Sequence, residues 1–201
     1  MSAEFVAIIP IKRFIEGKSR LAPIFRKLQR KRIVKSIFEI VLKEVLKSNF
    51  KKVWILSNDY LIKAKFGSIS GIDVLFDEHY DLNKTLQAKF RIAALQSLVP
   101  VYLPADLPLI TSNDINIILQ KSLDGRNLTV IPDRKWKGTN CLVVPKHLVG
   151  DFVPSLGKLS YYSHLSQAKL NNWPIVTFEV FSVSNDLDTV EDLQIIRRYL
   201  K

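Results

Sequence analysis

The sequence contains a single cysteine, Cys141, and only three histidines in 201 residues. One cysteine excludes an internal disulfide framework and a thiolate metal cluster. The histidines are scattered, with no HExxH pattern and no obvious serine–histidine pair, so a zinc site or a hydrolase triad would be hard to assemble. We interpret His164, which lies at helical spacing from Tyr161, as a structural rather than a catalytic residue.

The chain also lacks long apolar runs. Its first residues, MSAEFVAIIP, have neither the basic region nor the apolar segment of about 7–15 residues that a secretion signal needs. No run approaches the ~18 apolar residues that a membrane span requires. Apolar residues still make up 47% of the chain, which is enough for a sizeable core. We therefore expect a soluble, cytoplasmic protein with one domain over residues 1–201.

The net charge of +11 is concentrated near the N-terminus. Residues 11–35 contain ten basic residues and one acidic residue, Glu16, and the rest of the chain adds only +2. Such a local cluster indicates an anionic partner, and both nucleic acid and a nucleoside triphosphate fit. The second half of the cluster also fits a solvated helix face. Lys12, Lys18 and Arg20 are instead expected on a loop directly after a strand.

Short apolar segments alternate along the chain with segments of helical periodicity. This alternation predicts an α/β fold, a three-layer α/β/α arrangement with a mostly parallel mixed sheet. Strands are expected at residues 5–10, 52–57, 73–76, 99–104, 128–132 and 142–145. Helices are expected at residues 33–45, 82–98, 111–120, 161–170 and 190–200.

Unusual polar residues follow several of the predicted strands. In sheets of this kind ligands bind outside the carboxyl ends of the strands, so a site is expected there. Asp106 lies between two prolines in PADLPL, directly after a predicted strand. Two interpretations fit this aspartate. It could be a ligand of Mg²⁺, which binds one or two carboxylates plus phosphate oxygens, or a turn residue that bonds to its own backbone.

The segment NDLDT at residues 185–189 carries two alternating carboxylates. In an extended chain Asp186 and Asp188 point the same way, and they repel each other unless a cation lies between them. Thr189 and Asp192, in contrast, resemble a capping box that opens the last helix. Asp186 and Asp188 are therefore candidate metal ligands, and which of them would accompany Asp106 stays open.

Cations follow the first predicted strand in IPIK and GKSRL. Lys12 and Lys18 could neutralise a triphosphate and the charge on a departing pyrophosphate. The GKS sequence is not a P-loop, because the earlier glycine of that motif is missing. An acceptor phosphate is largely dianionic at neutral pH, so it needs positioning and charge screening rather than a general base. These residues suit nucleotidyl transfer.

Eight motifs occur in a characteristic order: IPIK, KSRL, Leu82-Asn83, PADLPLI, IPD, Gly138-Thr139-Asn140, Gly157-x-x-Ser160 and DLDTVEDL. In this order the chain resembles the 2-phospho-L-lactate guanylyltransferase family, which acts in the biosynthesis of the deazaflavin coenzyme. The resemblance implies a fold like that of nucleotide-diphospho-sugar transferases, of the glycosyltransferase-A type. It also implies transfer of GMP from GTP onto a phosphorylated three-carbon acid, with release of pyrophosphate.

The resemblance further implies roles for individual residues. Mg²⁺ would be held by the carboxylates of Asp106, Asp186 and Asp188. The residues implied in nucleotide binding are Lys12, Lys18, Arg20, Asn83, Pro104 and Asp106, with catalytic roles for Lys12, Lys18 and Asp106. The residues implied in acceptor binding are Thr139, Asn140, Gly157 and Ser160.

Departures from the family pattern leave the acceptor and the assembly open. Lys137 stands where the family has a second glycine before the threonine, and LGKLSY around Gly157 replaces FGPGSF. The acceptor could be 2-phospholactate, phosphoenolpyruvate or 3-phosphoglycerate, acids of similar size and charge. Trp136 and Trp173, expected at the surface, leave room for a homodimer.

Other functions predict features that this sequence does not have. A molybdenum-cofactor-type guanylyltransferase or a sugar-phosphate nucleotidyltransferase would begin with a glycine-rich loop, where this chain has only Gly17. A nucleic-acid-binding protein would interleave aromatic residues with the basic cluster, which contains only Phe14 and Phe25. A non-catalytic binding protein on the same fold would be favoured if Asp106 or Asp188 were absent. We therefore expect no nucleic-acid partner and no membrane partner.

Overall fold

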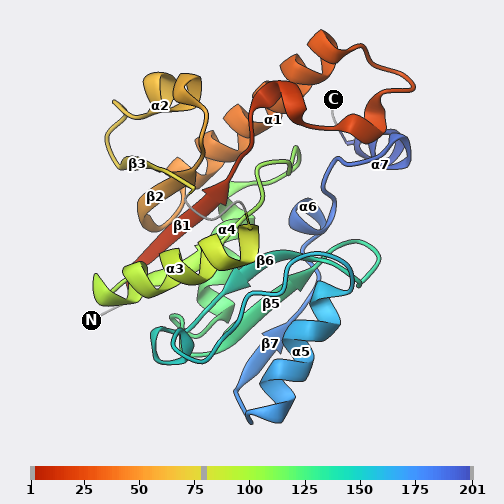
Figure 1. Ribbon diagram of the computed structural model, residues 1–201. Helices are drawn as coiled ribbons and strands as arrows, with labels where there is room; N and C mark the ends of the chain where they lie inside the picture. Colours follow the sequence, from red (N-terminus) through yellow and green to blue (C-terminus); the bar gives the residue numbers. More distant parts are fainter. Residues whose placement is uncertain (1–2, 78–80, 200–201) are drawn as a thin grey trace.

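The computed structural model describes residues 3–77 and 81–199. Its centre is a sheet of seven strands in the order β3-β2-β1-β4-β6-β5-β7, with helices on both faces (Figure 1). β6 is antiparallel to both of its neighbours, and the other neighbouring pairs are parallel. The strands are β1 (Phe5–Pro10), β2 (Phe50–Leu56), β3 (Ile72–Leu75), β4 (Val99–Tyr102), β5 (Leu128–Pro132), β6 (Thr139–Val143) and β7 (Ile175–Thr177). The predicted α/β class and mostly parallel mixed sheet are confirmed.

Helices cover the sheet in two layers, each with its own buried core. The period-2 alternation of β1 divides its side chains, so that Ala7 and Ile9 pack with α1 and α4 while Val6 and Ile8 pack with α3 and α5. The α-helices are α1 (Lys27–Lys47), α2 (Tyr60–Phe66), α3 (Leu82–Leu95), α4 (Ser112–Lys121), α5 (Ser160–Leu170), α6 (Phe181–Ser184) and α7 (Val190–Ile196). Short 3₁₀ turns are η1 (Phe14–Glu16), η2 (Ser19–Leu21) and η3 (Lys146–Leu148).

The structure corrects several predicted boundaries. The strand predicted at 142–145 begins at Thr139, because the polar side chains of Thr139 and Asn140 are buried and hydrogen-bonded rather than left in a loop. The helix predicted to reach residue 98 ends at Leu95, since Ser97 adopts a left-handed φ of 62°. α1 starts at Lys27, earlier than its apolar pattern indicated, and α2 was not predicted.

Two further predicted segments are longer than the observed ones. The strand predicted at 99–104 ends at Tyr102, before the proline-flanked turn that carries Asp106. The helix predicted at 190–200 ends at Ile196 and continues as a turn through residue 199. Leu200, the last residue of that prediction, lies outside the described residues.

The strand order reverses direction at the centre of the sheet. From β1 the chain moves outward to β2 and β3, and then returns to the other side of β1 with β4. β1 and β4 are parallel, so the loops that follow them leave the same edge of the sheet side by side. Such a switch point forms a crevice at the carboxyl ends of the strands, and the predicted Lys12 and Asp106 follow these two strands.

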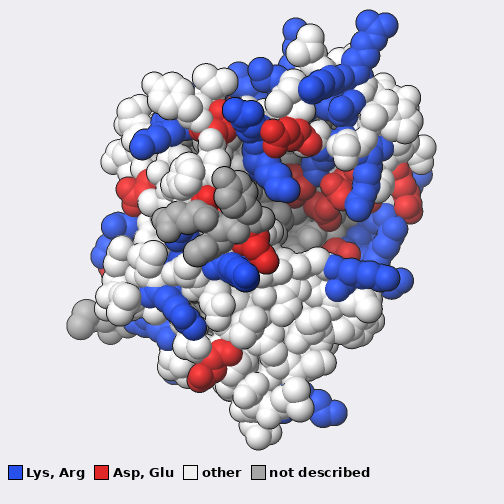
Figure 2. Space-filling view, in the orientation of Figure 1, with Lys and Arg blue, Asp and Glu red and all other residues white. Residues whose placement is uncertain are grey.

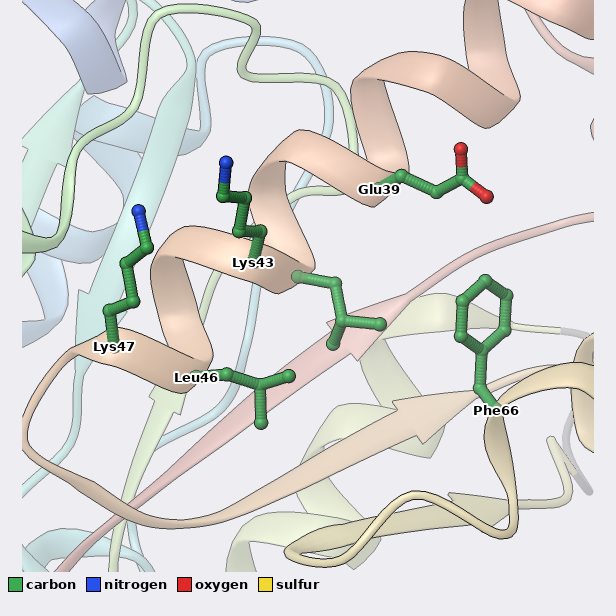
Figure 3. Close-up of a pocket in the computed structure, with 6 residues that line it drawn as sticks. Glu39, Lys43, Leu46, Lys47 and Phe66 are labelled. Carbon is green, nitrogen blue, oxygen red and sulfur yellow. The ribbon is translucent and has the colours of Figure 1, made fainter.

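A shallow surface groove of about 390 Å³ lies between α1 and α2, away from the predicted site residues (Figure 3). Apolar side chains, including Leu46 and Phe66, form its floor, while Lys43 and Lys47 extend away from it. In the described part of the chain no helix is both long enough and apolar enough to cross a membrane.

Candidate active site

Three carboxylates converge at the carboxyl end of β4. Asp106, Asp186 and Asp188 each place an oxygen within 4.8 Å of the other two. The backbone N–H of Leu187 donates to the carbonyl oxygen of Asp106 at 3.0 Å, which ties the 185–189 segment to the turn after β4. The Leu187 side chain is buried in the core, so its two neighbours direct their carboxylates to the other side of the chain. An all-oxygen set of this kind suits a hard divalent cation.

Asp186 is the most buried member of this carboxylate cluster. Asn140, near the start of β6, donates from Nδ2 to Asp186 Oδ1 at 3.0 Å and to the Val183 carbonyl oxygen at 2.9 Å. Burial, followed by the charge of Asp106, raises the pKa of Asp186 to about 6. The negative charge at Asp186 is therefore incompletely compensated by the protein, and a bound cation would relieve it.

Lys18 balances the other two carboxylates. Its ammonium group forms an ion pair with Asp106 and lies 3.2 Å from Asp188 Oδ1, while Arg20 Nη1 lies 2.6 Å from Asp188 Oδ2. Burial alone would lower the pKa of Lys18, but the charges of Asp106 and Asp188 and their hydrogen bonds outweigh it and raise the pKa. Lys18 is therefore a fixed cation within the carboxylate cluster.

The loop that carries Lys18 is held by apolar anchors on both sides. Phe14 is buried against Phe38 with ring centroids 5.9 Å apart, and Leu21 is fully buried. Lys18 itself adopts a left-handed φ of 57° between η1 and η2. The apolar residues thus position a loop that would otherwise be entirely polar, and the Lys18 ammonium is directed inward, with only 6% of its side chain exposed.

The charges of this region form a recognisable surface feature. Figure 2 shows acidic side chains in a recess near the middle of the displayed face, with Lys and Arg side chains around it. In the same orientation, Figure 1 places the strand ends and α6 at this position. A recess with acidic groups inside and basic groups at its rim can bind a cation together with an anionic ligand.

Not every residue of the predicted nucleotide site joins the carboxylate cluster. Lys12 is exposed directly after β1 and forms no ion pair within the described residues, and Pro104 follows β4. Asn83, in the first turn of α3, donates from Nδ2 to the Leu156 carbonyl oxygen at 3.1 Å and accepts from the Leu156 N–H at 2.7 Å. Asn83 therefore joins α3 to the loop before Gly157, and its contact with a nucleoside stays a prediction.

The predicted acceptor residues gather where β6 and α5 begin. Thr139 Oγ1 lies 3.0 Å from His164 Nδ1, and His164 is one turn after Ser160 on the same face of α5. Gly157, in the loop before α5, has a φ of +129°, a conformation that side chains other than hydrogen rarely allow. The structure thus brings Thr139, Gly157 and Ser160 to the starts of β6 and α5, and Asn140, the residue after Thr139, links this region to Asp186.

The backbone amides at the start of α5 already donate to carbonyl oxygens of the protein. The Ser160 N–H donates to the Gly157 carbonyl oxygen at 3.3 Å, and the Tyr161 N–H donates to the Lys137 carbonyl oxygen at 3.1 Å. The side-chain hydroxyls of Thr139 and Ser160 are therefore the stronger candidates for binding an anion here. The glycine at position 138 has a steric explanation instead, because a Cβ there would lie 2.8 Å from Asp133 Oδ2.

A second polar network supports the metal-side segment, and only part of it was predicted. The capping box of Thr189 and Asp192 is confirmed at the start of α7. Asp192 also accepts from the Asp188 N–H at 3.1 Å and pairs with Arg134 at 3.2 Å. Burial would raise the pKa of Asp192, but these hydrogen bonds, led by those from Thr189, lower it. Arg134 was not predicted, and its only sequence signal is its position after the IPD motif.

The seven-stranded mixed sheet, with its switch point between β1 and β4, has the fold of the nucleotide-diphospho-sugar transferases. The structure is similar to that of a proposed nucleotide-diphospho-sugar transferase from Desulfovibrio desulfuricans G20, with a TM-score of 0.83 over 99% of this chain and 88% of that chain. The two share 16% sequence identity, so this likeness shows the fold alone. The family described as "Guanylyl transferase CofC like" matches residues 5–197, and the chain belongs to this family.

Two groups of relatives support the same assignment. The chain is 26% identical over 194 residues to the 2-phospho-L-lactate guanylyltransferase of Methanosphaera stadtmanae, covering 94% of this chain and 82% of the relative. It is 31% identical over 142 residues to the phosphoenolpyruvate guanylyltransferase of Chloroflexus aggregans, covering 68% and 69% of the two chains. The predicted family resemblance and the prediction of a nucleotidyltransferase are confirmed.

Proposed function

We propose that this protein transfers GMP from GTP onto a small phosphorylated acid and releases pyrophosphate, in deazaflavin coenzyme biosynthesis. The observation that carries the proposal is the convergence of Asp106, Asp186 and Asp188 with Lys18 at the switch point of the sheet, in a chain of the guanylyl transferase family. By their names, the two groups of relatives act on 2-phospho-L-lactate and on phosphoenolpyruvate. Both compounds are phosphate monoesters of three-carbon acids.

The residues of the carboxylate cluster fit a Mg²⁺ ion. The three carboxylates offer only oxygen ligands within 4.8 Å of one another, and the raised pKa of Asp186 indicates negative charge that a cation would stabilise. Asp106 and Asp188 would hold the ion together with Asp186. When bound, Mg²⁺ would polarise the nucleotide phosphate and contribute several kcal/mol of charge stabilisation in the transition state.

Basic side chains lie where the leaving group would carry charge. Lys18 and Arg20 contact the carboxylate cluster, and Lys12 is exposed on the same loop after β1. Fixed cations at this position would stabilise the negative charge that develops on pyrophosphate. Lys18 would exchange its carboxylate contacts for phosphate oxygens, from a backbone position that the buried Phe14 and Leu21 hold.

The acceptor would be bound at the start of β6, at the same edge of the sheet as the carboxylates. Its phosphate, held by the hydroxyls of Thr139 and Ser160, would attack the α-phosphorus of GTP in line. A new bond forms between the acceptor oxygen and the α-phosphorus while the bond to the bridging oxygen breaks, and that electron pair leaves with pyrophosphate. The phosphate monoester is already largely dianionic at pH 7, so no side chain needs to remove a proton.

Pyrophosphate release tests the proposal directly. The purified protein is assayed with Mg²⁺ and each of the four nucleoside triphosphates against 2-phospholactate, phosphoenolpyruvate and 3-phosphoglycerate. We expect release only when GTP and one phosphorylated acid are both present, and mass spectrometry would then detect the guanylylated acid. Folded protein that is silent in all of these pairs would contradict the proposal, and release with a sugar phosphate instead would indicate a sibling transferase.

The binding partners, cellular location and oligomeric state of the protein are also part of the proposed function. GTP and a phosphorylated three-carbon acid would be the partners of a cytoplasmic protein without nucleic-acid or membrane partners. The exposed tryptophans leave room for a homodimer: Trp136 is 38% exposed and contacts Tyr161, and Trp173 is half-buried beside Phe152. Size-exclusion chromatography with light scattering measures the mass in solution and decides between a monomer and a dimer.

A further inference from the structure

His164 is a buried imidazole that the proposed chemistry does not use. It is fully buried on α5, and its ring stacks on Phe152 with centroids 5.5 Å apart and 28° between the planes. Burial lowers the pKa of His164 to about 4. The imidazole is therefore neutral at pH 7, and only one of its two ring nitrogens carries a proton.

The partners of the ring decide which nitrogen carries that proton. The backbone N–H of Ser155 lies 3.1 Å from Nε2, and a backbone N–H can only donate, so Nε2 must be the unprotonated acceptor. The proton then lies on Nδ1, which is 3.0 Å from Thr139 Oγ1 and donates to it. The Nδ1–H tautomer of His164 follows from the identity of its two partners.

This tautomer determines what the Thr139 hydroxyl can do. A hydroxyl has one proton to donate, and Thr139 already accepts a hydrogen bond from His164, so its own proton must be directed to another acceptor. Within residues 3–77 and 81–199, Thr139 Oγ1 has no second side-chain or backbone partner. Ser160 lies one helical turn from His164 on the same face of α5, which places its hydroxyl toward the same region.

His164 also fixes the loop that leads to Gly157, together with two other side chains. Gln167 donates to the Val153 carbonyl oxygen at 2.7 Å and accepts from the Val153 N–H at 3.0 Å. The loop is therefore hydrogen-bonded by Gln167 at Val153, by His164 at Ser155 and by Asn83 at Leu156. Of the three side chains, His164 is the one whose other hydrogen bond goes to a predicted acceptor residue.

We propose that neutral His164 is a positioning residue for the phosphorylated acceptor, which holds the Thr139 hydroxyl as a dedicated donor and fixes the loop before Gly157 at the same time. A hydroxyl that can only donate outward is matched to an anionic oxygen, and under the proposed function that oxygen belongs to a phosphate monoester dianion. The inference deepens the proposed function and rests on it for the identity of the ligand. The tautomer itself does not depend on any activity.

The tautomer is measured by NMR on protein with ¹⁵N-labelled histidine rings at pH 7. His164→Gln identifies the His164 signals among those of the three histidines in the chain. We expect a protonated Nδ1 and an unprotonated Nε2 for His164 in the protein without substrate. A protonated Nε2, or a ring protonated at both nitrogens at pH 7, would overturn the inference whether or not the enzyme is active.

Two substitutions separate the two hydrogen bonds of the ring. The side-chain amide of His164→Asn can reach the Nδ1 position and still donate to Thr139, whereas that of His164→Gln can reach the Nε2 position and still accept from Ser155. We expect His164→Gln to raise the KM for the acceptor roughly ten-fold with little change in the KM for GTP. His164→Asn should keep a KM for the acceptor closer to that of the wild type.

Companion variants test whether the effect passes through Thr139. Thr139→Val should raise the KM for the acceptor about as much as His164→Gln, the double variant should show much less than the product of the two effects, and Thr139→Ser should restore most of the binding. His147→Gln, at an exposed position in η3, is the matched control and should change nothing.

Each outcome of these measurements bears on a different conclusion. Independent, multiplicative effects of His164→Gln and Thr139→Val, or equal rises in the KM for GTP and for the acceptor, would overturn the positioning role. Thermal unfolding checks that each variant is folded, and the ring tautomer of the wild type keeps the test decisive if His164→Gln unfolds. If the wild type shows the expected tautomer but transfers no nucleotide to any phosphorylated acid, the proposed function fails and the positioning role fails with it, while the tautomer stands.

Discussion

The two sides of β6 stabilise polar groups in different ways. Thr139 and Asn140 are neighbours in this strand, so their side chains point to opposite faces of the sheet. Asn140 faces the carboxylate cluster, where full charges are paired with Lys18 and Arg20 and the Asp106 and Asp188 side chains are 30% and 40% exposed. Thr139 faces His164, and these two side chains are uncharged, buried and hydrogen-bonded to each other.

This difference indicates how each side would respond to a ligand. On the side of Asn140 and the carboxylates (the charged side), a divalent cation can replace Lys18 and Arg20 as the partner of the carboxylates, and a triphosphate can replace the carboxylates as the partner of the two basic side chains. Like charges then replace like charges, and water can reach the carboxylates. On the side of Thr139 and His164 (the neutral side), no such exchange of charges is available, because the groups are uncharged and lie in a region of low dielectric constant. The charged side is therefore suited to a reaction in which charge moves, and the neutral side to recognition of a fixed shape.

The largest expected effect is on the charged side. Asp106→Asn removes one negative charge from the cluster and one partner of Lys18, and should lower turnover roughly 100- to 1,000-fold, because a metal clamp contributes several kcal/mol in the transition state. Pyrophosphate release measures turnover, and circular dichroism should show that the fold is intact. Asp73→Asn, at an exposed position in β3, is the control and should keep turnover unchanged. Near-normal turnover in Asp106→Asn would contradict the metal assignment.

The next effect is a pH dependence that belongs to the neutral side. The pKa of His164 is about 4 in the folded protein and 6.5 when exposed, so the unfolded chain binds a proton first as the pH falls. The contribution of His164 to the free energy of unfolding should therefore be fully present above about pH 6.5. It should be lost as the pH falls from about 6.5 to 4, by up to about 3 kcal/mol. Urea unfolding at a series of pH values measures this slope.

His164→Gln isolates the histidine contribution to that slope. The lowered pKa of Asp192 also costs stability at low pH, but Asp192 is present in both proteins and its contribution cancels in the comparison. The variant should be less stable than the wild type at pH 7 and should lose less stability on acidification. Parallel curves for the two proteins would show that His164 is not kept neutral by the fold.

A smaller effect concerns how the negative charge of the carboxylate cluster is compensated in the absence of a metal ion. Lys18→Gln leaves the three carboxylates with Arg20 as their remaining cation, and should reduce stability by about 1–2 kcal/mol after allowance for the exposure of the carboxylates. Added Mg²⁺ should then raise the melting temperature of Lys18→Gln by more than that of the wild type, because the cation binds a more negative cluster.

Differential scanning fluorimetry in EDTA and in Mg²⁺ measures that difference. Lys12→Gln is the matched control for stability, since Lys12 lies on the same loop but is exposed and outside the carboxylate cluster. Equal gains from Mg²⁺ in the wild type and in Lys18→Gln would mean that Lys18 does not balance the site where the ion binds.

The same contrast explains how much of the site could be predicted from the sequence. Asp106, Asp186 and Asp188 were found because a carboxylate at a strand end has few structural reasons to be there, and the alternating pattern of the last two implies one direction in an extended segment. The sheet was predicted well for the same kind of reason, since buried strands such as Phe5–Pro10 are continuous apolar runs.

The neutral side carries no comparable signal. Thr139 and Asn140 are polar, so the sequence favoured a loop there, and only the hydrogen bonds to His164 and Val183 make a buried strand acceptable. Asn83 is predicted to contact the nucleoside, and that stays a prediction; its amide also bonds to Leu156, far along the chain, a contact that no motif indicates. Pairings of this kind depend on tertiary contacts between distant residues, which no local periodicity encodes.

The smallest expected effect tests whether the neutral side ends at Thr139 or extends to α5. Ser160→Ala removes one hydroxyl and should raise the KM for the acceptor about five-fold, with kcat and the KM for GTP little changed, because a neutral hydrogen bond contributes about 1 kcal/mol. Ser166→Ala, at an exposed position on the same helix, is the control for any general weakening of α5. A change confined to the KM for GTP would place Ser160 in the nucleotide site instead. It would also mean that acceptor binding on the Thr139 side of β6 does not extend to α5.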